Sequence, residues 1–138
     1  MFVHADGSGG FVFRKGKPLK WQKPNKDAFQ GNVYILIDGY SFSVTSEFAA
    51  IAHNNKRATF IGRETGGGYL GNTSGFFVVS VLPNSGVEVA TPQWDYWMSV
   101  ENPIKDRGIM PDIEIWPTAK DVLDGRNLEM ERVMNVIN

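Results

Sequence analysis

The chain has 138 residues, with 14 basic against 15 acidic side chains, a formal net charge of −1, and no cysteine. Hydrophobic residues make up 42% and charged residues 21%, which is the composition of a folded domain rather than of a disordered chain. The lack of cysteine excludes a disulfide scaffold, a thiolate metal site and a cysteine nucleophile. No apolar run approaches the ~18 residues that a membrane-spanning helix needs, and the near-neutral charge gives no global reason to expect nucleic acid as a partner.

The first 30 residues are predicted to form a basic, polar lead-in arm in front of a domain over residues 31–138. Residues 1–26 hold six basic side chains and one acidic one, and they are rich in Gly and Pro around a short apolar patch at 11–13. We expect a solvated segment here, with contact to phosphates as the alternative. No signal-peptide pattern is expected at this end.

A strand, a helix and a second strand are predicted next. Val33 to Ile37 is a continuous apolar run, typical of a strand buried on both faces in a parallel sheet. Val44 to Asn54 is predicted as a helix, with Phe48, Ile51 and Ala52 on its core-facing stripe. Arg57 to Gly62 is a second short strand. This order within about thirty residues is typical of a parallel crossover unit.

The rest of the chain is predicted to alternate short strands with loops and to end in two helices. A glycine-rich loop over 64–75 precedes a β-hairpin around 83–86. The other predicted elements are strands at Asp95–Val100 and Ile113–Ile115 and helices at Ala119–Leu123 and Leu128–Ile137. Together they indicate an α/β fold with a mixed sheet. Trp94, Tyr96 and Trp97 are expected to pack on the sheet, with a peptide-binding groove as the alternative.

The candidate chemistry lies between the first predicted strand and the helix, in the segment DGYSFSVTSE over residues 38–47. A serine there is at the carboxyl edge of a sheet, where ligands of open α/β folds bind. It is also at a helix N-terminus, whose free N–H groups suit the oxyanion that a nucleophilic serine generates. The competing interpretation is that Ser43 or Thr45 only caps the helix.

Residues 33–75, read as VYILIDGYSFSVTSEFAAIAHNNKRATFIGRETGGGYLGNTSG, resemble the catalytic core of the S41 serine peptidases. These are the C-terminal-processing, or tail-specific, proteases and their tricorn-type relatives. The segment DRGIMPD at 106–112 resembles a family motif near the end of the catalytic domain, so the resemblance extends over about residues 31–117. It implies a ClpP/crotonase-like spiral of β-β-α units, incomplete in this chain.

The resemblance places the nucleophile at Ser43. The subgroup pattern Phe-Ser-Ala-Thr-small-Glu fits FSVTSE at 42–47 with Val44 in place of Ala, whereas in many members the nucleophile stands three residues before the glutamate. Ser41 and Ser46 are therefore the alternatives, and Val44 would contribute its backbone N–H. The loop residues Gly66, Gly67 and Gly68 are expected to line the substrate cleft, because glycine lets backbone approach it closely. A strand rather than a helix follows this loop, which argues against nucleotide binding.

The general base is not identified by the sequence. The processing proteases use a lysine in the glycine loop, and the matching place near Gly68 has none. Tricorn-type relatives use a histidine from an earlier part of the chain and a late glutamate. His4 and His53 match no such position, and His53 is expected to be solvated or paired with the helix dipole. Glu101 and Asp106 are candidate late carboxylates, for which a solvated role is the alternative.

The resemblance implies the nucleophile-bearing portion of a serine endopeptidase that cleaves polypeptides through an acyl-enzyme, without metal or cofactor. We expect this chain to be inactive alone, because a missing N-terminal region or a second chain would complete the fold. The alternative is a non-catalytic S41-like module that binds a peptide or small apolar ligand. A third hypothesis is one half of a shared fold in an oligomer. The relatives work outside the cytoplasm.

Overall fold

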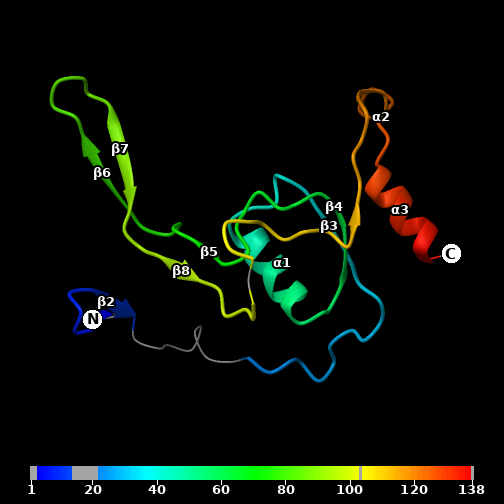
Figure 1. The fold of residues 1–138 in the computed structure, drawn as a ribbon, viewed down its shortest axis with the longest axis horizontal. Helices are drawn as coiled ribbons and strands as arrows, with labels where there is room; N and C mark the ends of the chain where they lie inside the picture. The colour runs from blue at the N-terminus through cyan, green and yellow to red at the C-terminus, as the bar shows by residue number, and fades with distance from the viewer. Residues whose placement is uncertain (1–2, 14–21, 103, 138) are drawn as a thin grey trace. The chain divides into compact units, whose positions relative to one another are not determined.

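The computed structural model describes residues 3–13, 22–102 and 104–137 of the chain (Figure 1). The chain divides into two compact units, Met1–Gly31 and Asn32–Asn138. Both helices and strands are present, so the predicted α/β class is confirmed.

The first unit contains a β-hairpin that the sequence did not predict. Strand β1 (Val3–Ala5) pairs antiparallel with β2 (Phe11–Phe13). The connecting turn is held by Asp6, whose Oδ1 accepts hydrogen bonds from the backbone N–H groups of Ser8 and Gly10 at 2.8 and 3.0 Å. Most of the basic residues of the predicted arm lie outside the described residues, namely Arg14, Lys15, Lys17 and Lys20.

The second unit is built on a parallel sheet of order β3-β4-β9. Strand β3 (Tyr34–Ile37) is connected through helix α1 (Val44–Asn54) to β4 (Thr59–Gly62), and β9 (Ile113–Glu114) pairs with the other edge of β4. This arrangement confirms the predicted strand–helix–strand crossover. It also puts the carboxyl ends of β3 and β4 at the same edge of the sheet, where α1 begins.

The core is narrower than the sequence pattern predicted. In β3 only Ile37 is buried, and Leu36 is 37% exposed, so this strand is not covered on both faces. On α1 the predicted stripe is wrong for Phe48 and Ile51, which are exposed, whereas Ala52 is partly buried against the core. Small side chains face the core instead and let the helix approach the sheet closely. The buried cluster consists of Ile37, Ala49, Ala50, Phe60, Tyr69, Met98 and Ile109.

Four short strands form antiparallel ribbons apart from this sheet, rather than the single mixed sheet that was predicted. Strand β5 (Gly71–Asn72) pairs with β8 (Tyr96–Trp97). The predicted hairpin is confirmed as β6 (Phe77–Val81) and β7 (Glu88–Pro92). In the described part of the chain each of these ribbons has only two strands.

The predicted terminal helices are confirmed as α2 (Ala119–Leu123) and α3 (Leu128–Ile137). Thr118 starts α2 with a capping box, since its hydroxyl accepts from Asp121 N while the Asp121 carboxylate accepts from Thr118 N. Helix α3 lies against β3 and β4, but only Val133 of its predicted apolar face is buried. Met130 and Met134 are exposed.

Candidate active site

The turn that follows β3 is fixed by its own polar groups. The N–H of Ser41 donates to the Asp38 carbonyl at 2.9 Å, and the Ser41 hydroxyl accepts from Asp38 N–H at 3.1 Å. Oδ1 of Asp38 accepts from the N–H of Tyr40 at 2.9 Å. This closed turn carries the chain from the carboxyl end of β3 to Ser43 within a few residues.

Ser43 has a backbone conformation that side chains rarely adopt. Its φ is 54° and its ψ is −132°, in a region that favours glycine, and it stands immediately before the first residue of α1. A serine on a strained turn between strand and helix is the arrangement that projects a nucleophilic hydroxyl from an α/β sheet. The Ser43 side chain is exposed and makes no capping hydrogen bond, so the N-cap interpretation lacks its defining contact.

The two alternative serines are both committed to structural hydrogen bonds. Ser46 is 2% exposed, and its hydroxyl donates to the Ser43 carbonyl at 2.8 Å. Ser41 is 8% exposed and its hydroxyl closes the turn described above. A buried hydroxyl with a satisfied partner cannot reach a substrate carbonyl, so these geometries favour Ser43 over Ser41 and Ser46.

The start of α1 supplies a hydrogen-bond donor beside Ser43. The N–H of Thr45 donates to the Phe42 carbonyl at 3.2 Å, and the N–H of Glu47 donates to the Ser43 carbonyl at 3.1 Å. For the N–H of Val44 the described residues offer no hydrogen-bond partner. A free N–H at the positive end of the helix dipole is suited to hold an oxyanion.

The glycine loop packs against the turn of residues 38–43, which we call the serine turn. The N–H of Gly67 donates to the Ser41 carbonyl at 3.1 Å. A Cβ atom at Gly67 would lie 2.1 Å from Ser46 Oγ and 2.8 Å from Phe42 Cα, so only glycine permits this approach. Gly66 touches the same turn, because a Cβ there would lie 2.1 Å from the Gly39 carbonyl oxygen.

A buried threonine and an ion pair hold the glycine loop from its other side. The Thr65 hydroxyl donates to the Gly67 carbonyl and accepts from Ile109 N–H, both at 2.8 Å. Glu64 accepts two hydrogen bonds from Arg107, at 2.8 and 2.7 Å, and one from Gly108 N–H at 2.8 Å. The Arg107 guanidinium and this N–H lower the pKa of Glu64 from 4.5 to about 2.

A cleft of about 460 Å³ opens beside the glycine loop. Gly66 and Gly68 line it together with Asp106 and the aromatic side chains of Tyr96 and Trp97. These two aromatic residues therefore border a groove, as the alternative interpretation of residues 94–97 had it. Ser43 and Gly67 are not among the lining residues, so of the three glycines expected at the substrate cleft only Gly66 and Gly68 border this one.

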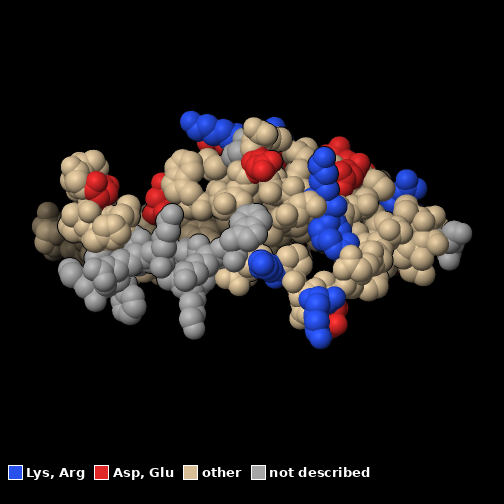
Figure 2. Space-filling model, turned by 90° about the horizontal axis from the view of Figure 1, so that it is seen from below, with Lys and Arg blue, Asp and Glu red and all other residues tan. Residues whose placement is uncertain are grey.

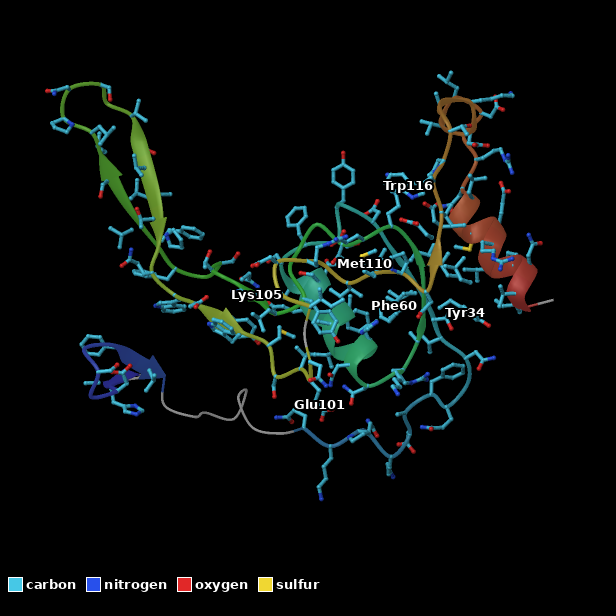
Figure 3. The ribbon with its side chains drawn as sticks, in the orientation of Figure 1. Tyr34, Phe60, Glu101, Lys105, Met110 and Trp116 are labelled. Atoms are coloured by element: carbon cyan, nitrogen blue, oxygen red, sulfur yellow. The ribbon has the colours of Figure 1, made fainter. Side chains whose placement is uncertain are left out.

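His53 and Glu101 do not lie near Ser43. His53 is in the last turn of α1, about 15 Å from Ser43 along the helix axis. It is half-buried, its Nδ1 is 3.0 Å from the Tyr69 hydroxyl, and its ring contacts Phe60, so it is neither solvated nor held only by the helix dipole. Glu101 lies beside the C-terminal end of α1 (Figure 3), where its N–H donates to Asn54 Oδ1 at 2.7 Å.

The sequence did not predict the pairing of Glu64 with Arg107. The opposite charges of the segments RET at 63–65 and DRG at 106–108 were the available signal, but nothing local shows that the two segments meet. A second polar group at the sheet edge was also missed. The Arg63 guanidinium lies 3.8 Å from the Asp38 carboxylate and 5.6 Å from the centre of the Trp116 ring. Asp38 follows β3, Arg63 follows β4 and Trp116 follows β9.

The family model for peptidase family S41 matches residues 5–115 of the chain. The chain belongs to peptidase family S41. This match covers the β3–α1–β4 unit, the serine turn, the glycine loop and the DRGIMPD segment, so the predicted family is confirmed.

Other comparisons give less detail about this S41 chain. The crystal structure of mature CPAF matches with 23% sequence identity and a TM-score of 0.43, covering 72% of this chain and 18% of that one. The S41 chain thus spans less than a fifth of the length of that protein. No curated protein matches it significantly.

Several site classes find no support in the residues that the structure describes. No group of three or more His, Asp or Glu side chains there is arranged to hold a metal ion. No helix among the described residues is long and apolar enough to cross a membrane. On the face seen in Figure 2, basic and acidic residues are interspersed among uncharged ones.

Proposed function

We propose that this chain is the nucleophile-bearing portion of an S41 serine endopeptidase, with Ser43 as the nucleophile. The observation that carries the proposal is the backbone of Ser43, held at φ 54° and ψ −132° with its side chain exposed and uncapped. Strain of this kind costs about 1–3 kcal/mol and persists where the surroundings impose it, which is common at catalytic residues. Family membership supplies the reaction class, which is hydrolysis of a peptide bond.

In this mechanism the Ser43 oxygen attacks the carbonyl carbon of the scissile bond while a base takes the hydroxyl proton. The Val44 N–H then stabilises the oxyanion, with the dipole of α1 behind it. The proton passes to the leaving amine as the acyl-enzyme forms, and water releases the acyl group. Gly66 and Gly67 keep the serine turn in place.

We further propose that the base comes from a polypeptide segment other than residues 32–138. The S41 resemblance points to a histidine from an earlier part of the chain in tricorn-type relatives. Such a segment, from the same polypeptide or from a second one, would also complete the ClpP/crotonase-like spiral of β-β-α units. This chain alone is then expected to have no efficient peptidase activity, because a serine hydroxyl without a base is a weak nucleophile at neutral pH.

The test supplies the base from solution. The chain is treated with a fluorophosphonate, which phosphonylates activated serine hydroxyls, with and without neutral imidazole. Slow labelling that imidazole accelerates, and that Ser43→Ala abolishes, supports the proposal. Ser46→Ala is the matched control and should label like the wild-type chain. Absence of labelling in saturating probe and imidazole, or labelling that survives Ser43→Ala, would refute it.

The rival function, a non-catalytic peptide-binding module, makes the opposite prediction. Such a module needs the cleft but not the hydroxyl. A peptide that binds equally well to the wild-type chain and to Ser43→Ala, in a chain that the fluorophosphonate never modifies, would favour the rival. No described contact favours it at present, since a binding role does not account for the strained backbone at Ser43.

A further inference from the structure

The hairpin of β6 and β7 is exposed along its whole length (Figure 1). Every residue of Phe77–Val81 and Glu88–Pro92 is exposed, although most of them are apolar. The register puts Val79 opposite Ala90 on one face and Val78 opposite Thr91 on the other, so both faces carry apolar side chains. An isolated two-stranded ribbon is only marginally stable in water, so we expect this hairpin to pair with a further strand.

The backbone of β6 presents an unprotected edge. The N–H of Leu82 donates to the Val87 carbonyl and that of Gln93 to the Phe76 carbonyl, both at 2.9 Å. Hydrogen-bonded pairs alternate along an antiparallel ladder. The peptide groups of Phe77, Val79 and Val81 therefore point away from β7 to the free edge of β6.

Natural sheets protect such edges with charged residues, proline or bulges. Strand β6, with the sequence FVVSV, has neither charge nor proline, and its register with β7 is one to one. The outer edge of β7 differs, because that strand carries Glu88 and ends at Pro92. The edge of β6 is thus the one that is open to pairing with another strand.

Charge and symmetry both favour a second copy of this chain as the occupant. Residues 76–93 contain one charged side chain, Glu88, so two copies meet without strong repulsion and a highly charged partner gains nothing. Two copies related by a two-fold axis present the same edge to each other.

We propose that β6 pairs antiparallel with β6 of a second copy across a two-fold axis at Val79, the middle one of the three residues that face the free edge, giving a four-stranded sheet of order β7-β6-β6-β7. This interface is independent of the proposed peptidase function, because neither Ser43 nor the glycine loop takes part in it. It predicts a dimer of the full chain whose formation depends on the edge of β6 and not on that of β7.

The first test compares proline substitutions on the two edges by sedimentation velocity over a wide range of protein concentrations. Val79→Pro removes one N–H from the proposed interface in each copy but none from the β6–β7 ladder, so the dimer should weaken about thirtyfold or more. Ala90→Pro, the matched change on β7, should leave the dimer unchanged. A monomeric wild-type chain, or equal effects of the two substitutions, would overturn the proposal.

The second test does not depend on how proline is tolerated. The natural chain has no cysteine, so Val79→Cys and Ala90→Cys each introduce a single thiol. In the proposed sheet the two β6 strands are about 4.8 Å apart, within reach of a disulfide, whereas the two β7 strands are about 14 Å apart. Mild oxidation should cross-link Val79→Cys and not Ala90→Cys. Equal yields, or no cross-link at residue 79, would contradict the interface.

Discussion

Replacing Ser43 by glycine and by alanine separates backbone strain from helix capping. A residue with a side chain held at φ 54° and ψ −132° costs about 1–3 kcal/mol relative to an unstrained one. Glycine adopts this conformation freely but loses about 0.5–1 kcal/mol of additional chain entropy on folding. Ser43→Gly should therefore stabilise the chain by about 1 kcal/mol. Ser43→Ala keeps the strain and loses no capping bond, so it should change stability by less than about 0.5 kcal/mol.

Urea unfolding followed by tryptophan fluorescence measures both changes, since the chain has four tryptophans. A gain of 1 kcal/mol shifts the midpoint upward by about 0.5 M urea for a small domain. Ser46→Gly is the matched control and should destabilise, because Ser46 lies inside α1 and its hydroxyl is bonded. If Ser43 were a capping residue, Ser43→Ala would cost about 1 kcal/mol and Ser43→Gly would give no gain. That result would refute the strain argument.

Three further predictions concern the glycine loop and the sheet on which the site is built. Gly67→Ala should destabilise the chain by about 2 kcal/mol, because the new Cβ would lie under 3 Å from packed atoms. A Cβ at Gly39 meets nothing within 4 Å, so Gly39→Ala should be nearly neutral in the same urea assay. Asp112→Ala should cost about 1–3 kcal/mol, because it removes the 2.7 Å acceptor of the Phe60 N–H, and Asp112→Asn, which keeps an acceptor, should cost less; equal costs would contradict this. The lowered pKa of Glu64 adds stability that is complete above about pH 4.5 and is lost as the pH falls toward about 2. The free energy of unfolding of Glu64→Gln, measured against pH, should therefore lack about 1 kcal/mol of this acid dependence. Identical pH curves for the variant and the wild-type chain would contradict the pairing.

The sequence predicted the elements of the second unit well because their signals are local. Helix α1 contains two adjacent alanines and follows a strand that is bounded by Asp38-Gly39, and the bounds of the helix are those predicted. The β6–β7 hairpin has the turn residues of 83–86 between two β-branched runs. These features depend on near neighbours in the chain, and no distant contact overrides them.

The faces of the elements could not be predicted in the same way. The stripe of α1 that contains Phe48 was predicted to face the core, but Phe48 is 62% exposed, whereas Ala49 and Ala50 are buried. Periodicity identifies a helix and its apolar side, yet which side is covered depends on what packs against it. The same limit applies to β6, whose apolar residues are all exposed.

The candidate site was predicted in part. The position of Ser43 came from a local pattern together with the S41 resemblance, whereas its positive φ has no sequence signal, because serine is not a residue that marks such a conformation. The contact between Gly67 and the serine turn joins residues more than twenty positions apart. The bracing of this loop by Glu64 and Arg107 spans more than forty, so neither contact was visible from spacing alone.

The most direct test of the central claim is the position of the fluorophosphonate adduct in the tryptic peptide 27–56, which contains all three candidate serines. Fragmentation mass spectrometry of the chain labelled in the presence of imidazole locates the phosphonyl group to one residue. Our account predicts that the added mass resides on Ser43, with Ser41 and Ser46 unmodified. An adduct on either of those two serines, or one distributed among several hydroxyl groups, would contradict it.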